Sequence, residues 1–363
     1  MQKKLIALAV AGLASTGAFA QTNVTVYGLV DAAFIYTNVN GGDRNNTAAN
    51  EQHGRDTFAI QSGQLAGSRL GFKGTEDLGN GLKAVFVLEY ALANDINAGI
   101  GTGALAARQQ YVGLSGKAGA VTLGRQYAPG YYAAAANDAL AASPALSVTD
   151  AAAAFIGSSI RGASPARWNN AVNYASPTIG GFSGQVIYAM GENTNELAMG
   201  ESYGIGAKYA AGPVSVNYVY HNAAVTQGAN AGVLSEHYVG GSFDLKVVKL
   251  IASAQTLDGG NRALAGQARQ GSTYTFGAVV PVGRGNIHAG YAYGDADSST
   301  NAPDTFNGTT QGVSVAYTHG LSKRTTLYTG LRYQSSDSRN AVNAATQASG
   351  NLTAFGAGIM HTF

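Results

Sequence analysis

Most of this chain consists of segments of about ten residues in which apolar side chains alternate with polar or small ones. In the first segment Val26, Val30 and Phe34 share one parity, while Thr25 and Asp31 share the other. A period of two places the two sets on opposite faces of a β-strand. The pattern recurs at 82–90, 214–221, 274–280 and 287–293. The alternation therefore predicts an all-β protein.

Two kinds of connection alternate between these segments. Short turns are expected at 77–81, 116–119, 180–181, 212–213, 244–245, 281–285 and 320–323. Longer polar connections are expected near 41–55, 94–103, 128–166, 191–200, 224–234, 258–268, 297–307 and 338–350. Seven short and eight long connections predict sixteen antiparallel strands, with both ends of the chain on the short-turn side.

The composition indicates what surrounds the apolar face of each strand. Charged residues are 12% of the chain, about half the usual share, and the aromatic residues of several segments lie near the segment ends. An apolar outer band with aromatic girdles is typical of a transmembrane β-barrel. No apolar run outside the N-terminus is long enough for a membrane helix. Alternation over 355–363 predicts a last strand that pairs with the first, since an open edge in lipid would leave backbone groups unpaired.

The first twenty residues have the layout of a secretory signal peptide: Lys3 and Lys4, an apolar stretch, and the small-residue site 18–20. We expect cleavage before Gln21, which leaves 21–363 as a single barrel domain. Two of the 22 basic residues lie in this leader, so the remainder balances 20 acidic ones. A chain without net charge lacks the basic footprint of a nucleic-acid-binding protein. The chain has no Cys, which excludes disulfides and thiolate metal sites.

Several stretches in order resemble the general, trimeric porins of Gram-negative bacteria, and most closely those of β-proteobacteria. They are 26–31, 68–79, 123–126, 170–177 and the terminal Phe363. The resemblance implies a sixteen-stranded outer-membrane barrel around a water-filled channel. It also implies a homotrimer among membrane lipid and lipopolysaccharide that passes ions and small hydrophilic solutes, without a reaction or a cofactor.

The resemblance further implies that the third loop folds inward and narrows the channel. The matching segment is about 128–166, the longest connection in the chain. A structureless loop of that length is uncommon unless it has a function. Its small residues, with Tyr131, Tyr132 and Asp138, suit a segment packed against an inner wall.

In related porins, wall arginines face acidic groups at the constriction, and the matching motifs assign Arg69, Arg108 and Arg167 to the wall. Parity gives an independent argument. If Leu70 and Phe72 point outward, Arg69 and Lys73 point inward. Outward directions for Tyr111 and for Trp168, Val172 and Tyr174 likewise predict inward Arg108 and Arg167. Glu89 lies opposite Leu88 and Tyr90, which predicts an inward carboxylate, whereas parity aims Arg125 outward.

Fixed charges in a narrow aqueous passage act strongly on mobile ions. With Glu89 and Asp138 as the acidic partners, the inward set predicts a small positive excess and a weak preference for anions. The alternative is structural: each arginine pairs with a carboxylate to hold the loop against the wall.

A rival function is an outer-membrane barrel that acts as an adhesin or an enzyme. The stretch 200–204 matches G-x-S-x-G, but it opens a strand and not a strand-to-helix turn. The six His lack metal-ligand spacing, and Asp295 and Asp297 read as a solvated loop tip in preference to a cation site. The favoured prediction is a passive channel.

Overall fold

The computed structural model describes residues 23–41, 55–96, 106–162, 166–191, 201–227, 230–259, 270–297, 308–338 and 350–363. The predicted signal peptide therefore lies outside the described residues. The strands are β1 (Asn23–Gly41), β2 (Arg55–Ser62), β3 (Arg69–Gly79), β4 (Leu82–Ala91), β5 (Ala107–Gly116), β6 (Gly119–Tyr127), β7 (Arg167–Ala175), β8 (Phe182–Ala189), β9 (Ser202–Ala211), β10 (Val214–Gln227), β11 (Asn230–Asp244), β12 (Lys249–Asp258), β13 (Gln270–Val282), β14 (Gly285–Asp297), β15 (Gly308–Gly320), β16 (Thr325–Ser338) and β17 (Gly350–Thr362). Two helices, α2 (Pro129–Ala136) and α3 (Val148–Phe155), lie between β6 and β7.

The seventeen labelled strands form a sixteen-stranded barrel because β2 and β3 are two halves of one strand. Along one side of β1, residues Ala32–Val39 pair with β2, and Asn23–Leu29 pair with β3. The opposite side of β1 pairs with β17 over Leu29–Gly41. The predicted strand number is thus confirmed, with one strand interrupted at residues 63–68.

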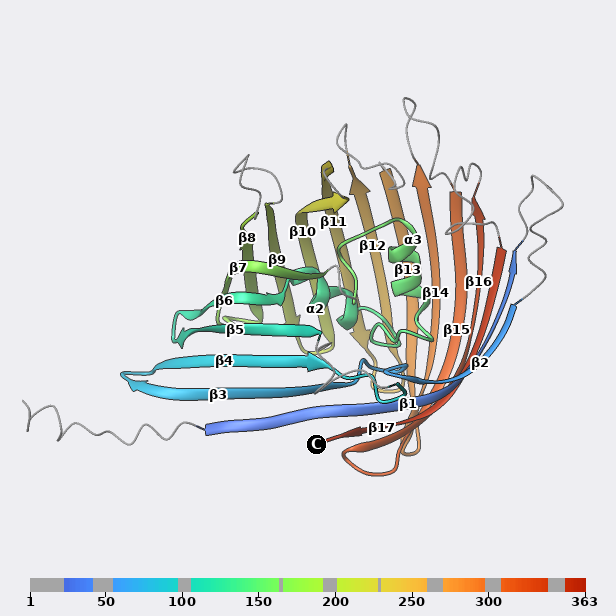
Figure 1. Cartoon of the computed structure of the whole chain (residues 1–363), viewed down its shortest axis with the longest axis horizontal. Helices are drawn as coiled ribbons and strands as arrows, with labels where there is room; N and C mark the ends of the chain where they lie inside the picture. The colour runs from blue at the N-terminus through green and yellow to red at the C-terminus, as the bar shows by residue number, and fades with distance from the viewer. Residues whose placement is uncertain are drawn as a thin grey trace, which may run out of the picture.

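The β1–β17 pairing closes the barrel antiparallel, as predicted (Figure 1). The backbones of Gly28 and Phe363 exchange hydrogen bonds of 3.2 and 3.1 Å. Asn23 pairs with Thr75 near the β3–β4 turn, and Thr362 N–H donates to Arg324 beside the β15–β16 turn. Both described ends therefore lie on the short-turn side.

The alternation in sequence becomes an outer and an inner face. Val26, Phe34 and Phe58 are 54, 43 and 66% exposed on the outer face, whereas Asp31 and Ile35 on the opposite parity of β1 are 0 and 4% exposed. Hydrocarbon offers no hydrogen-bond partners, and apolar side chains need none. This outer face therefore suits contact with the hydrocarbon layer of a membrane.

One predicted long connection is wrong. The stretch 224–234 is not a loop, since β10 and β11 pair without a break to Gln227–Asn230. Asn, Gly and Gln suggested a polar loop, but Val225, Thr226 and Val233 are β-branched residues that favour a strand. This hairpin therefore extends well beyond its sequence-predicted end.

The segment 128–162 lies within the curve of the sheet, where α2 and α3 are seen in Figure 1. Helix α2 contacts β6 and β8–β11, and α3 contacts β13–β15. Leu140 and Leu146 pack with Ala33, Ile35 and Tyr328 of the inner wall, while Ile156 packs with Leu234, Leu257 and Ala296. Among the described residues, no helix is both long and apolar enough to span a membrane.

Candidate functional site

Arg108 and Glu89 form a buried ion pair on the inner face of β4 and β5. Arg108 Nε lies 2.8 Å from Glu89 Oε1, and the two side chains are 7 and 5% exposed. Arg108 Nη2 also donates to Tyr127 Oη at 2.8 Å, and Tyr27 Oη donates to Glu89 Oε2 at 3.0 Å. Two predicted site residues are thus brought together, each with further polar partners.

The parity argument for Arg108 is wrong, although its side chain does lie inside. Val112 and Leu114 are 58 and 49% exposed, so Tyr111, which precedes Val112 on the opposite parity, faces inward and not outward as predicted. Uninterrupted alternation would then aim Arg108 outward. The register shifts here, because Glu89 pairs with Gln109 but Tyr90 pairs with Ala107. Arg108 is the extra residue of a β-bulge, which re-aims its side chain towards Glu89.

The break between β2 and β3 positions Arg69 and Arg108. Asp31 Oδ2 accepts from Leu65 and Ala66 N–H at 2.6 and 2.9 Å, so a buried carboxylate holds the interrupting segment 63–68. Arg69 Nε donates to Gly67 O at 2.8 Å. A β-carbon added at Gly67 would lie 3.1 Å from Arg108 Nη1, so the backbone passes close to this guanidinium.

The same segment also supports the long loop. Gln64 O accepts from Ser143 Oγ at 2.7 Å and from Ala145 N–H at 3.2 Å. Leu65 packs against the cluster that contains Leu140 and Leu146. The strand break thus links the wall arginines and the loop into one unit.

Arg167 lies at the start of β7, across the sheet from Tyr127. Its guanidinium carbon is 5.4 Å from the centre of the Tyr127 ring. Arg125 contacts the same region, since its Nε donates to Ala107 O at 3.0 Å and its Nη1 to Asn169 Oδ1 at 2.5 Å. Arg125 is therefore held on the backbone of β5 and by the side chain of Asn169.

The predicted outward direction of Trp168 is wrong. Trp168 is 7% exposed and packs with Ala128, Ala171 and Ile187, and its ring lies 4.8 Å from that of His221. Gly124 pairs with Ala171 and Gln126 with Trp168. Two residues of β7, Asn169 and Asn170, therefore lie opposite the single residue Arg125 of β6. This irregularity breaks the alternation on which the prediction for β7 rested.

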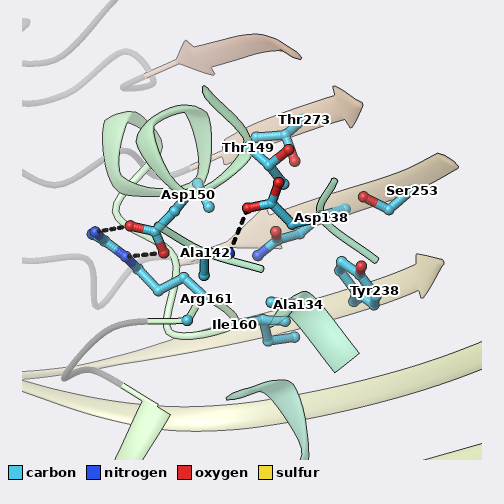
Figure 2. A pocket seen from close by; sticks show the side chains of 13 residues that line it. Ala134, Asp138, Ala142, Thr149, Asp150, Ile160, Arg161, Tyr238, Ser253 and Thr273 are labelled. Carbon is cyan, nitrogen blue, oxygen red and sulfur yellow. Dashed lines mark hydrogen bonds and ion pairs between the residues drawn. The ribbon is translucent and has the colours of Figure 1, made fainter. Parts of the chain in front are cut away.

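Asp138 organises the loop and does not face the arginines. Its carboxylate accepts from Leu140 N–H at 2.9 Å, Ala142 N–H at 2.8 Å and Ser147 Oγ at 2.5 Å. Figure 2 shows the Asp138–Ala142 bond beside the pocket between the loop and β11–β13. Burial raises the pKa of the Asp138 carboxyl, although these hydrogen bonds act in the opposite direction. Ion pairs in the described residues do not include one between Asp138 and an arginine.

Two buried side chains that the sequence did not single out anchor the loop to the wall. Glu236 is 0% exposed and accepts from the N–H groups of Ser159 and Ile160 and from Ser158 Oγ. His221 Nε2 accepts from Gly130 N–H at 3.1 Å, and its Nδ1 lies 2.9 Å from Ser159 Oγ. The sequence feature that could have identified Glu236 and His221 is a charged or polar residue at a strand position that faces inward.

A third missed residue is Arg332 on β16, which is separated from β3 by β17 and β1. Its Nη2 donates to Gln334 Oε1 at 2.6 Å, and Nη1 reaches Ala145 O of the loop at 3.5 Å. Within the loop itself, the Arg161 guanidinium is paired with Asp150 at 2.6 Å (Figure 2).

Several positive side chains of the inner face therefore lack a carboxylate partner among the residues that the structure describes. Glu89 is paired with Arg108 and Asp150 with Arg161, whereas Asp138 accepts hydrogen bonds from donors of the loop. Within the described part of the chain, Arg69, Arg167 and Lys73 have no carboxylate within ion-pair distance. The described part of the chain also contains no group of three or more His, Cys, Asp or Glu side chains that could hold a metal ion.

Comparisons with known proteins agree with this architecture. Residues 7–339 match a family model described as Gram-negative porin. Outer membrane porin protein 32 of Delftia acidovorans is 31% identical over the full length of both chains. The major outer membrane protein P.IB of Neisseria meningitidis serogroup B is 29% identical and aligns over 90% of this chain and 91% of its own.

Solved structures match as well. The anion-selective porin from Comamonas acidovorans has a TM-score of 0.75 and 27% identity, with 94% of this chain and 100% of that chain covered. In vitro folded OmpT of Vibrio cholerae, in its trimer form, has a TM-score of 0.64 at 13% identity, over 94% of this chain and 99% of its own, and shares the fold. With a barrel closed by β1 and β17 and a family match over nearly its whole length, this chain belongs to the Gram-negative porins and is an outer-membrane porin.

Proposed function

We propose that this porin is a passive, weakly anion-selective diffusion channel for ions and small hydrophilic solutes. Arg69, Arg108 and Arg167, with Lys73, form its positive wall, and the loop 128–166 narrows the passage beside them. The observation that carries the proposal is the imbalance of partners: the nearby carboxylates are engaged, whereas Arg69, Arg167 and Lys73 lack a carboxylate partner in the described residues. The anion-selective porin from Comamonas acidovorans has the same fold.

The magnitude favours local charges over net charge. The interaction energy between one unpaired wall charge and a mobile ion 4 Å away is about 4 kcal/mol at an effective dielectric of 20. Physiological salt screens charges beyond about 8 Å, so side chains distant from the passage contribute little. Arg69, Arg167 and Lys73, which have no carboxylate partners in the described residues, lie on the inner face, while the chain without residues 1–20 is neutral.

The test is the zero-current potential of the purified porin in a planar bilayer under a KCl gradient. We expect the sign of an anion-preferring channel, with a preference that declines as salt rises because screening grows. A cation-preferring channel would refute the proposed selectivity, and a channel without conductance would refute the proposed transport.

The buried Ser159–His221 contact does not support the enzyme alternative. A Ser nucleophile needs an accessible hydroxyl and a base with a free acceptor nitrogen. His221 is 0% exposed and its Nε2 is occupied by Gly130 N–H. The structure therefore offers this pair as a loop anchor, and we propose that the porin carries out no reaction and holds no cofactor.

We also propose a homotrimer of chains that begin at Gln21, surrounded by outer-membrane lipid and lipopolysaccharide. Large apolar side chains such as Val26, Phe58 and Ile60 are 54, 66 and 69% exposed, which suits contact with lipid or with a second copy. Mass spectrometry of the protein in mild detergent is expected to give three chains per particle, each lacking residues 1–20. A monomer under all detergent conditions, or a retained leader, would contradict the corresponding part of this proposal.

A further inference from the structure

A cluster of tyrosines lies among the positive residues of the inner wall. The rings of Tyr127 and Tyr131 are stacked, with centres 3.7 Å apart and an interplanar angle of 10°. Tyr132 packs edge-on against both, at 5.6 and 5.7 Å. Three aromatic rings in mutual contact at the start of the loop form a rigid aromatic surface, since such rings have few rotatable bonds.

Further tyrosines extend this surface along the wall. Tyr132 lies close enough to Tyr111 and Glu89 for electrostatic interaction. Tyr27 donates to Glu89 and so joins the same group from β1. The cluster of Tyr27, Tyr111, Tyr127, Tyr131 and Tyr132, called the tyrosine cluster below, therefore spans β1, β5, β6 and α2.

Cations lie directly against the faces of these rings. Arg167 lies over Tyr127 at 5.4 Å, and Lys73 Nζ lies over Tyr27 at 5.2 Å. Both are free of carboxylate partners in the part of the chain that the structure describes. Positive charge beside an aromatic cluster is complementary to a ligand that has a negative group on a flat ring.

Tyr132 provides the accessible part of the cluster. It is 52% exposed, whereas Tyr127 is 5% exposed. Because α2 packs against the inner face of β8–β11, this exposed phenol ring faces the interior of the barrel and not the lipid. A solute that passes the wall arginines can therefore place a ring against Tyr132.

We propose that the tyrosine cluster is a binding subsite for small aromatic carboxylates, with the ring against Tyr132 and the carboxylate towards Arg167 and Lys73. The inference rests on the proposed anion-selective function and adds a class of solute to it. Benzoate and cyclohexanecarboxylate serve as probes, since they have the same charge and nearly the same size but differ in aromaticity.

The experiment measures how each probe blocks single-channel chloride current. Aromatic pairs add about 0.5–1.5 kcal/mol beyond area burial, which corresponds to about two- to tenfold in affinity. We therefore expect benzoate to reach half-block at about two- to tenfold lower concentration than cyclohexanecarboxylate. Tyr132→Leu should abolish the difference, and Tyr132→Phe should retain it. Tyr333→Leu, the same change at a 45% exposed position on the outer face, should leave the difference intact.

Two outcomes would overturn the inference. Equal block by both probes in the unmodified porin would remove the aromatic subsite, as would an unchanged benzoate preference in Tyr132→Leu. The KCl zero-current potential is measured in the same bilayers and reports separately on the proposed function. An anion-preferring channel with no aromatic preference would refute this inference alone.

Discussion

Arg108→Gln is expected to lower both the stability of the barrel and its preference for anions. The substitution leaves Glu89 at 4% exposure with only the Tyr27 and Tyr127 hydroxyls as partners. Removing one member of a buried ion pair costs about 3–5 kcal/mol, because the remaining charge stays desolvated. The midpoint of thermal unfolding in detergent should fall by several degrees, and the zero-current potential should move towards cations.

The double variant Glu89→Gln/Arg108→Gln separates these two effects. It removes the uncompensated charge, so we expect most of the lost stability to return, as in a double-mutant cycle of coupled residues. Selectivity should also return close to that of the unmodified porin, since the pair contributes no net charge. If the double variant were as unstable as Arg108→Gln, the Arg108–Glu89 pair would not be the cause of the instability.

Glu236→Ala is expected to release the loop from the inner wall. Glu236 accepts hydrogen bonds from Ser158 Oγ and from the N–H groups of Ser159 and Ile160, all in a buried region. Each donor left without a partner costs about 1–3 kcal/mol. Single-channel recordings should show a larger and noisier conductance, because the loop no longer keeps one position.

Asp244→Ala is the matched control for that variant. Asp244 is likewise a carboxylate of β11, but its partner is Lys246 of the adjoining turn, at 3.6 Å, and both side chains are exposed. Exposed ion pairs are worth about 0–1 kcal/mol, so the conductance should not change. An unchanged conductance in Glu236→Ala would show that Glu236 does not hold the loop in position.

The sequence predicted the barrel because its outer face obeys a simple rule. Lipid accepts only apolar side chains, so residues such as Val26 and Phe34 recur at every second position and reveal the strands. The β1–β17 pairing followed from the same rule, since a barrel cannot leave an edge in lipid. The extended end of the β10–β11 hairpin was missed because it combines polar loop-type residues with β-branched ones.

The candidate site was less predictable because its side chains depart from regular alternation. Arg108 occupies a β-bulge, and Trp168 precedes an irregularity at Asn169 and Asn170, so counting by two gives wrong directions at both places. Asp138 and Glu236 show a second limit. Their charge indicates a polar partner, but only the folded chain shows that these partners are loop donors and not arginines.

The central claim is that charges on the inner wall, and not the net charge of the chain, set the selectivity. Arg167→Gln and Arg284→Gln change the net charge equally. Arg167 lies beside Tyr127 on the inner wall, whereas Arg284 is exposed at the β13–β14 turn and bonds to Leu321 O at 2.9 Å. The most direct test is therefore the zero-current potential of both variants and the unmodified porin under one KCl gradient at low salt. We predict a shift towards cations in Arg167→Gln and no shift in Arg284→Gln, while equal shifts in both variants, or no shift in Arg167→Gln, would contradict the account.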